Sequence, residues 1–342
     1  MNALLTQYWR WFQVLSITKI VNLLRCYSSF YLSKWFKKQS INHLPFTLSF
    51  EPTTTCNLSC PECPSGLKSF TRPTGMSPLD VYTKVLEDVK HHLIFLYLYF
   101  QGEPFLHKDF IEMIRLAKDR RLFTITSTNG HFLTKSKCIE IVESGLDRLI
   151  ISMDGSTQET YETYRKDGNL KKVIQGIEQL VATKRERKTQ HPYIVLQMLV
   201  VAPNEHQTEE VRAIGTSLGV DEVVFKTAQI YDFKKGHPLI PTKDLYSRYR
   251  KTSDGTWEIK NKLENQCWKM WHSAVSTWDG KIIPCCFDKD AQYEMGNITQ
   301  KSFKEIWLHA KYQAFRKAIL HSRKNIDICQ NCSEGTKVWE TV

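Results

Sequence analysis

The chain has 342 residues, of which 42% are hydrophobic and 24% are charged. This length allows one large α/β domain with a smaller appended one, and the composition is ordinary for a globular protein. The formal net charge is +11, but the basic residues are spread along the chain as on solvated helix faces, which argues against nucleic-acid binding. A basic surface instead favours an anionic substrate, an acidic peptide or an electron-donor protein.

Residues 1–45 are rich in aromatic and aliphatic side chains. Arg10, Lys19 and Arg25 interrupt them, so no uncharged run reaches the ~18–20 residues that span a bilayer. A small-residue cleavage site is also missing, which argues against a signal peptide. We expect a helical N-terminal extension that packs on the main domain; the alternative is an amphipathic helix that touches a membrane surface.

Residues 46–227 alternate between strand-like and helix-like patterns. Repeated βα units predict a parallel sheet, either doubly wound or curled into a partial barrel. Strands are predicted at 47–51, 93–100, 122–126, 148–153, 193–201 and 222–226. Helices are predicted at 80–91, 110–120, 136–144, a stretch ending near 184, and 205–218.

The remainder of the chain divides into two parts. Residues 228–266 lose the periodicity and gain Lys, Pro, Asp and Gly, so we predict a linker there. Residues 267–342 combine short strands, turns and scattered Cys and Trp with one apolar-periodic helix beyond Ile298. This pattern is typical of a small module that a bound metal holds together.

Three cysteines follow the first predicted strand at spacing C-x3-C-x2-C: Cys56, Cys60 and Cys63. Three thiols cannot pair evenly into disulfides, and such spacing without a secretion signal indicates metal ligation in a reducing, cytoplasmic setting. A zinc ion or a four-iron cluster normally takes four protein ligands, so three leave one metal position open. Cys26 and Cys138 stand alone and are predicted to be buried residues of helices.

A second group of cysteines lies near the C-terminus. Cys267, Cys285, Cys329 and Cys332 form a complete four-thiolate set, and Cys286 could replace Cys285. Spacing alone leaves open whether they hold a structural zinc ion or an iron–sulfur cluster.

Polar side chains follow the predicted strands where each one ends. In parallel α/β architectures these ends meet at one edge, where ligands bind. Hydroxyl, amide, carboxylate and guanidinium groups there suit a ligand with amino, carboxylate and ribose groups. The candidate residues are Gly102, Glu103, Asn129, Ser152, Asp154 and Arg165.

The chain resembles the radical S-adenosylmethionine (SAM) superfamily in two features. The C-x3-C-x2-C motif lies between the first strand and a helix, and Gly102-Glu103-Pro104 follows the second strand. The later cysteine pattern resembles the SPASM or twitch extension of that superfamily. The resemblance implies a partial (β/α)6 barrel and a [4Fe-4S] cluster on Cys56, Cys60 and Cys63, with SAM on the fourth iron. It also implies one auxiliary [4Fe-4S] cluster on Cys267, Cys285, Cys329 and Cys332.

The resemblance also carries over to single positions. Gly102 and Glu103 match the motif that holds the SAM amino group, and Ser152 and Arg165 match positions near its carboxylate.

Asn129 and Asp154 lie where ribose contacts are expected. Two positions depart from the usual pattern: Glu62 stands where an aromatic residue is common, and Gln101 replaces the first glycine of Gly-Gly-Glu.

The implied activity is that of a radical SAM enzyme acting on a peptide or a small metabolite, by oxidation, crosslinking or epimerisation. A flavodoxin or ferredoxin would donate electrons. The auxiliary cluster would be an electron relay or acceptor, or would anchor the substrate, and its complete set of four protein ligands favours relay over anchor. The alternative from another class is a non-catalytic iron–sulfur or zinc protein that binds a partner. Residues 1–45 do not resemble a leader-peptide-binding domain.

Overall fold

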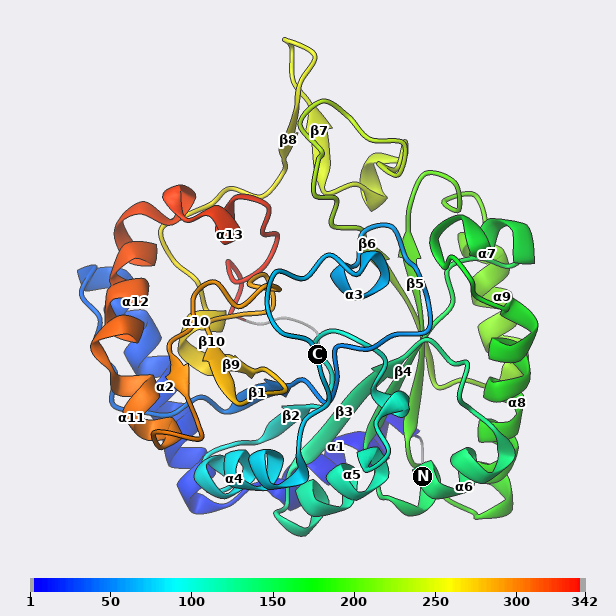
Figure 1. The fold of residues 1–342 in the computed structure, drawn as a ribbon, viewed down its shortest axis with the longest axis horizontal. Coiled ribbons are helices and arrows are strands. Elements are labelled where there is room, and N and C mark those ends of the chain that lie inside the picture. The colour runs from blue at the N-terminus through cyan, green and yellow to red at the C-terminus, as the bar shows by residue number, and fades with distance from the viewer. Residues whose placement is uncertain (1–2, 339–342) are drawn as a thin grey trace.

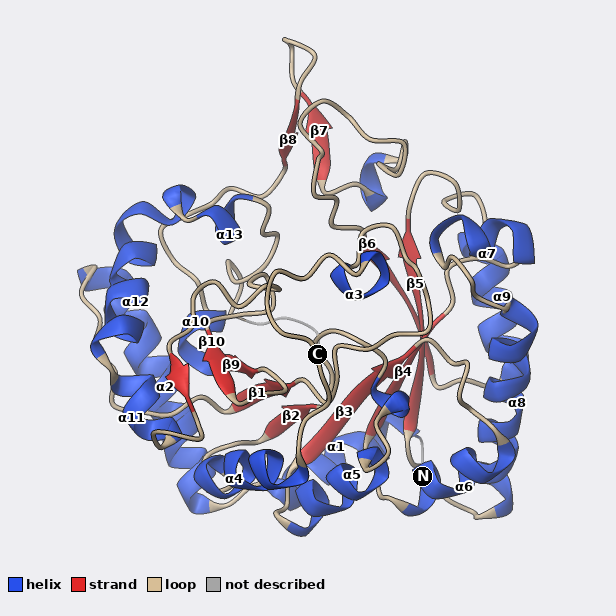
Figure 2. Cartoon of the chain, in the orientation of Figure 1, coloured by secondary structure: helices blue, strands red, loops and turns tan. Residues whose placement is uncertain are grey.

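The computed structural model of the protein describes residues 3–338. Residues 1–2 and 339–342, the outer ends of the predicted segments 1–45 and 267–342, lie outside the described residues. One nine-stranded sheet curves around the centre of the molecule, and helices cover its outer side (Figures 1 and 2). Five βα units with a sixth parallel strand, a helical N-terminal part and a small C-terminal module confirm the predicted α/β architecture.

Six parallel strands form the barrel part of the sheet, and they are neighbours in chain order. These strands are β1 (Thr47–Phe50), β2 (Phe95–Tyr97), β3 (Phe123–Thr128), β4 (Arg148–Ser152), β5 (Tyr193–Val200) and β6 (Glu222–Thr227). The helices between them are α3 (Pro64–Leu67), α4 (Leu79–Val89), η1 (Pro104–Leu106), α5 (Phe110–Asp119), α6 (Lys135–Glu143), α7 (Gln158–Tyr164), α8 (Leu170–Glu186) and α9 (Thr208–Leu218).

The two faces of the barrel strands differ in burial, as strand β5 illustrates. Ile194, Leu196 and Met198 are fully buried, and α9 packs on this strand. Gln197 and Leu199 alternate with them and are only half-buried. Side chains of a strand alternate between the two faces of the sheet, so Gln197 and Leu199 point into the barrel.

Two N-terminal helices, α1 (Ala3–Val14) and α2 (Ile17–Phe36), pack against the rest of the molecule. On α1, Trp11 makes edge-on contacts with Phe95 and Phe123 at the starts of β2 and β3, so this helix lies across the N-terminal end of the barrel. On α2, the Cys26 thiol donates a hydrogen bond to the Trp271 carbonyl oxygen across 3.3 Å. Among the described helices, none is long and apolar enough to cross a membrane.

The C-terminal module extends the same sheet, because β9 (Ser273–Ser276) pairs in parallel with β1. Strand β10 (Lys281–Ile283) is antiparallel to β9, and β11 (Gly296–Asn297) follows, which gives the sheet order β11-β10-β9-β1-β2-β3-β4-β5-β6. The helices of the module are α10 (Lys269–His272), α11 (Phe303–Leu308), α12 (Ala310–Ser322), η3 (Arg323–Asn325) and α13 (Asp327–Gln330).

Local structure differs from the sequence predictions in three places. The predicted linker 228–266 contains η2 (Asp244–Tyr246) and an antiparallel hairpin of β7 (Tyr249–Lys251) and β8 (Trp257–Ile259), which projects from the molecule in Figure 1. The predicted strand 93–100 is paired only at 95–97, although Leu93, Ile94 and Leu98 beside the paired segment are buried.

The third difference concerns two predicted helices that are each divided in two. The stretch ending near residue 184 is broken between α7 and α8, where Asp167 adopts a φ of 65°. The helix beyond Ile298 is broken at His309, whose extended backbone separates α11 from α12. Cys26 and Cys138 are buried in helices, as predicted.

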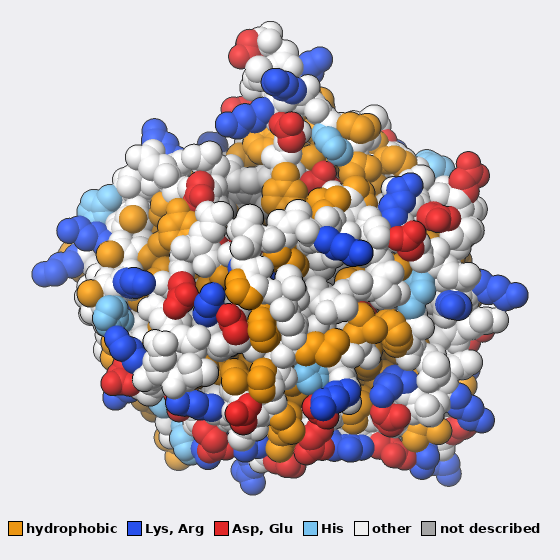
Figure 3. Space-filling model, in the orientation of Figure 1, with side chains coloured by type: hydrophobic (Ala, Val, Ile, Leu, Met, Phe, Trp, Pro, Cys, Tyr) orange, Lys and Arg blue, Asp and Glu red, His pale blue; other side chains and the backbone are white. Residues whose placement is uncertain are grey.

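On the face seen in Figure 3, basic and acidic side chains are interspersed around the rim. The positive net charge is therefore not gathered into one patch on that face.

Candidate functional site

The cysteine loop follows β1 and ends where α3 begins. The Cys63 N–H donates to the Cys60 carbonyl oxygen across 3.3 Å, which closes the last turn of the loop. Gly66 of α3 packs directly beneath this turn, because a Cβ atom there would lie 2.5 Å from the Cys60 nitrogen. A glycine at this position is what allows α3 to pack against the cysteines.

A second loop, which follows β2, is fastened to the cysteine loop through Gly102. This residue has a φ of +73°, and a Cβ atom would overlap the Thr53 carbonyl oxygen. The Gly102 N–H donates to Ser65 Oγ across 2.9 Å, and the Glu103 N–H donates to the Thr55 carbonyl oxygen across 2.8 Å. The two loops therefore form one unit whose geometry requires glycine at position 102.

The Glu103 carboxylate is buried beside this unit. It accepts hydrogen bonds from Thr128 Oγ1 at 2.8 Å, from the Asn129 N–H at 2.7 Å and from the Phe105 N–H at 3.2 Å. Burial raises the pKa of Glu103 to about 7, although these hydrogen bonds and the charge of Arg165 act in the opposite direction. A cationic group of a ligand would therefore be bound strongly here, because it would neutralise a poorly solvated carboxylate.

Arg165 is positioned by Asp154 at the carboxyl end of β4. The Arg165 Nε atom lies 2.5 Å from Asp154 Oδ2, and Asp154 Oδ1 accepts the Leu199 N–H at 2.7 Å. The Arg165 Nη1 atom lies 3.9 Å from Cys60 Sγ. Both oxygens of Asp154 thus have protein partners, and the ribose contact expected of Asp154 stays a prediction.

Asn129 and Ser152 complete the set of sequence-predicted ligand contacts. The Asn129 Nδ2 atom lies 2.8 Å from Asn57 Oδ1 and 3.9 Å from Cys56 Sγ. Ser152 is the buried last residue of β4 and pairs in register with Gln197 of β5. Hydrogen bonds and ion pairs thus tie Glu103, Asn129, Asp154 and Arg165 to the cysteine loop or to one another, while Ser152 lies at the same strand ends.

Burial is the main influence on the pKa values of the Cys56 and Cys60 thiols. Burial raises the pKa of Cys56, and it raises the pKa of Cys60 to about 11, while Arg165 lowers both. Cys63 raises the pKa of each through mutual repulsion of thiolates. Because thiolates are the metal-binding form, a bound cation at this loop would stabilise the deprotonated state of all three.

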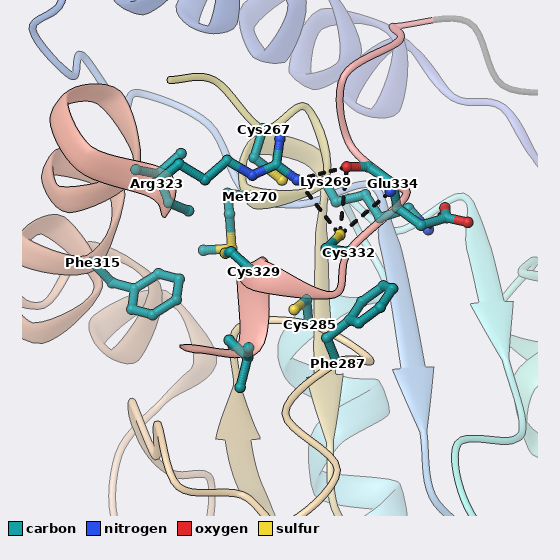
Figure 4. Close-up of a pocket in the computed structure, with 12 residues that line it drawn as sticks. Cys267, Lys269, Met270, Cys285, Phe287, Phe315, Arg323, Cys329, Cys332 and Glu334 are labelled. Atoms are coloured by element: carbon teal, nitrogen blue, oxygen red, sulfur yellow. Dashed lines mark hydrogen bonds and ion pairs between the residues drawn. The ribbon is translucent and has the colours of Figure 1, made fainter. Parts of the chain in front are cut away.

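The four C-terminal cysteines line one cavity between α12, α13 and the loop after β10 (Figure 4). Cys267, Cys285, Cys329 and Cys332 all contribute to its wall, whereas Cys286 is exposed and does not. Apolar side chains close much of the rest of the wall: Met270, Phe287, Phe315, Ile319 and Ile328.

A buried arginine that sequence analysis missed also lies on this cavity. The Arg323 Nη2 atom lies 3.5 Å from Cys332 Sγ and 2.7 Å from the Glu334 carbonyl oxygen, and Nη1 donates to the Gln266 carbonyl oxygen across 2.7 Å (Figure 4). Its Nε atom is buried without a hydrogen-bond partner in the described chain. In the sequence, the only indication of this contact was that Arg323 lies six residues before the Cys329–Cys332 pair.

The donor set and shape of this cavity fit a compact group held by four thiolates. Gly335 closes one side, because a Cβ atom there would lie 2.5 Å from Cys267 Sγ. Within residues 3–338, no three Cys, His, Asp or Glu side chains converge closely enough to hold a single metal ion. The unpartnered Nε atom of Arg323 supplies a further hydrogen-bond donor for an acceptor in the cavity.

Ionisable side chains from distant segments of the chain lie close enough for their charges to interact. Lys226 is on β6, at one end of the sheet order, while Lys269 is on α10 of the C-terminal module. Lys226 is exposed to solvent, and the charges of Glu334 and Lys269 act on it. Burial raises the pKa of Tyr99, whose neighbours include Cys286 and Lys269. Sequence analysis missed this grouping, because its members come from elements that only the tertiary fold brings together.

Comparisons with known proteins agree with this arrangement. A family model of the radical SAM superfamily matches residues 50–213, and a SPASM iron–sulfur cluster-binding domain matches residues 267–333. A cofactor-modifying protein of a tungsten-containing aldehyde ferredoxin oxidoreductase, from Pyrococcus furiosus, is 27% identical over 300 residues. The alignment covers 79% of this chain and 82% of that relative.

Two solved structures share the fold. BtrN in complex with AdoMet and 2-DOIA superposes with a TM-score of 0.56 at 20% identity, covering 88% of this chain and 98% of that one. Streptococcus suis SuiB bound to S-adenosylmethionine superposes with a TM-score of 0.63 at 13% identity, covering 91% of this chain and 76% of that one.

Proposed function

The chain belongs to the radical SAM superfamily and carries a SPASM iron–sulfur domain, and on this premise we propose that Cys56, Cys60 and Cys63 bind three irons of a [4Fe-4S] cluster with SAM completing the fourth. When bound, the cluster supplies the electron that cleaves SAM, and the resulting 5′-deoxyadenosyl radical abstracts hydrogen from the substrate. The observation that supports the assignment is the joining of the cysteine loop to the Gly102–Glu103 loop, which lies where the SAM amino group is expected.

Different residues around the cysteine loop bind the different polar groups of SAM. Glu103 accepts the amino group, and the buried carboxylate gains a cation in return. Arg165 and Ser152 bind the carboxylate, with Asp154 holding the guanidinium in place. Asn129 lies close to Cys56 and is the stronger candidate for a ribose contact, because the Asp154 oxygens already have partners.

In the C-terminal module, Cys267, Cys285, Cys329 and Cys332 hold the auxiliary [4Fe-4S] cluster. All four line a single cavity, and a full set of four thiolates leaves no iron free to bind substrate. The auxiliary cluster therefore acts as an electron relay or acceptor. A ferredoxin or flavodoxin supplies electrons to the pair of clusters.

The substrate is a peptide side chain or a small metabolite that binds near Lys226 and Lys269. One solved structure with this fold is bound to a precursor peptide and another to 2-DOIA, so the fold accommodates both kinds of ligand. Lys226 is exposed to solvent and lies near the Lys269–Glu334 ion pair, in which Nζ and Oε2 are 2.6 Å apart. These charges favour a substrate that carries a carboxylate or phosphate group.

The test is anaerobic reconstitution followed by turnover of SAM with dithionite. The protein should bind about eight irons, from two four-iron clusters, and should form 5′-deoxyadenosine. Replacing Cys56, Cys60 and Cys63 by Ser should remove about four irons and abolish this product. The control C138A, at a buried cysteine outside both groups, should retain the irons and the product.

Two outcomes would contradict the proposal. Iron binding without 5′-deoxyadenosine under any reductant would leave a non-catalytic iron–sulfur protein. Zinc in the C-terminal module, after anaerobic purification from iron-replete cells, would refute the auxiliary cluster. Once cleavage is established, transfer of deuterium from candidate substrates into 5′-deoxyadenosine identifies the substrate, and anionic candidates should succeed first.

A further inference from the structure

Helix α2 has its polar face turned toward the protein. Lys19, Asn22, Ser29 and Ser33 are all buried, together with Cys26 and Phe30. This is the reverse of an ordinary surface helix, whose apolar stripe faces the core and whose polar residues face water.

Hydrogen bonds to the backbone stabilise this reversed face. The Asn22 side chain exchanges two hydrogen bonds with the backbone of Leu44, at 2.8 and 2.9 Å. The Lys19 ammonium donates to the Arg121 carbonyl oxygen across 2.7 Å. Ser33 Oγ accepts the Ser40 N–H across 3.2 Å. Because these buried polar groups are paired, the orientation of α2 is specific and fixed.

The outward face of α2 is mainly apolar, and Thr18, Arg25 and Ser28 are its exposed polar residues. Ile17 is 82% exposed, Trp35 is 69% exposed and Phe36 is 73% exposed. Helical spacing places the exposed apolar residues of α2 along one stripe. These residues are Ile17, Ile20, Val21, Leu24, Leu32, Trp35 and Phe36.

Helix α1 repeats the pattern. Thr6 and Gln7 are buried, while Leu5, Tyr8, Trp9 and Phe12 are exposed at three- and four-residue spacing. The two stripes contain most of the exposed large hydrophobic side chains within the described residues. Apolar surface of this extent marks an interaction site in a protein that is otherwise well packed.

The charge of this segment identifies the kind of partner. Residues 1–50 contain six Lys and Arg residues and no Asp or Glu. Of the six, Arg25, Lys37 and Lys38 are exposed. Anionic lipid surfaces bind segments that combine exposed tryptophan, phenylalanine and leucine side chains with cations that have no acidic residues nearby in the sequence. A second copy of the chain would instead bring these three exposed cations close to three others, which disfavours self-association.

We propose that the outward stripes of α1 and α2, together with Arg25, Lys37 and Lys38, dock the enzyme on an anionic membrane surface. The helices lie in the plane of the interface, with aromatic side chains at the level of the lipid headgroups. Trp11 of α1 packs on the barrel, so docking presents the N-terminal end of the barrel to the membrane. The strand ends that carry the candidate SAM site lie at the opposite end of the barrel and stay accessible.

The experiment is flotation of the reconstituted protein with vesicles of phosphatidylcholine, with and without phosphatidylglycerol. Binding should require phosphatidylglycerol and should weaken as salt rises. The triple variant F12S/W35S/F36S should bind at least tenfold more weakly. The matched control L245S removes a side chain that is 80% exposed elsewhere and should bind like the wild type. Reversal of charge in K37E/K38E should weaken binding without removing any apolar group.

Three results would overturn the proposal. They are no binding of the wild type to either vesicle, equal binding by the triple variant, and a concentration-dependent dimer that the triple variant abolishes. SAM cleavage in vesicle-free buffer should be the same in the triple variant and the wild type, since the substituted residues lie outside the candidate SAM site. Failure of the membrane proposal is therefore distinguishable from failure of the enzymatic one.

Discussion

The guanidinium group of Arg323 donates to the Cys332 sulfur across 3.5 Å, inside the cavity that the four C-terminal cysteines line. A hydrogen bond and a positive charge beside a ligating sulfur both stabilise the more negative, reduced state of an iron–sulfur cluster. Arg323 should therefore raise the reduction potential of the auxiliary cluster and favour its acceptance of electrons.

Replacing Arg323 by Gln should lower that midpoint potential, measured by redox titration monitored by electron paramagnetic resonance. A tenfold change in the equilibrium constant corresponds to 59 mV for one electron, and we expect a shift of at least about this size. K324Q removes the same charge from an exposed neighbour and should leave the potential unchanged. A shift of equal size in both variants would exclude the proposed role of Arg323.

Substitution of Gly102 by Ala should disrupt the candidate SAM site. The new Cβ would overlap the Thr53 carbonyl oxygen, so the two loops could not remain joined. We expect loss of SAM affinity and of iron from the first cluster, measured by calorimetry and iron analysis. Gly255 has a similar φ of +86° but no atom within 4 Å of its virtual Cβ, so G255A should cost only about 1 kcal/mol of backbone strain. Equal effects of the two variants would refute a specific role of the close approach.

Cys285 and Cys286 should differ sharply in their effect on the auxiliary cluster. Cys285 lines the cavity and Cys286 is exposed outside it. C285S should therefore lose the auxiliary cluster signal, whereas C286S should retain about eight irons per chain. Retention of the signal in C285S alone would show that Cys286 can take over as ligand.

The buried His43 should make the protein less stable in mild acid. Its Nε2 lies 2.8 Å from the Trp271 carbonyl oxygen, and burial lowers its pKa to about 4, although this hydrogen bond acts in the opposite direction. In the unfolded chain His43 is protonated below about pH 6.5, whereas in the folded chain it is protonated only below about pH 4. The free energy of unfolding therefore falls as the pH is lowered from 6.5 to 4.

The free energy of unfolding should drop by about 2 kcal/mol more in the wild type than in H43Q between pH 7 and pH 5. The glutamine amide can still donate to the Trp271 carbonyl oxygen but does not titrate. Denaturant titrations at both pH values measure this difference. Burial also lowers the pKa values of His191 and His272, but these two residues are present in both proteins and affect them equally. Parallel pH profiles would show that His43 is not responsible.

The sequence was most informative where function depends on neighbours along the chain. Cys56, Cys60 and Cys63 come from one loop, and the strand ends carry the other polar residues of the site in chain order. One local feature was nevertheless overlooked: Asp167-Gly168 is a turn pair, and it separates α7 from α8.

Features built from distant segments could not be predicted in the same way. The Arg323 guanidinium lies beside the Cys332 sulfur only in the folded module, and Lys226 of β6 lies near Lys269 of α10 only in the folded chain. The second strand was predicted too long for a related reason. Leu98 is as buried as a strand residue, but it follows the paired segment 95–97, and an apolar pattern reports burial without reporting pairing.

The pairing of β9 with β1 has a consequence for how the protein is made. Until Ser273–Ser276 have left the ribosome, β1 has a partner on one side only, and the nascent barrel presents an open edge to other chains. Such long-range pairing is slow, and an exposed edge invites aggregation in the meantime. The loop that carries Cys56, Cys60 and Cys63 follows β1, so the strand edge beside it is closed only after the final fifth of the chain has been made.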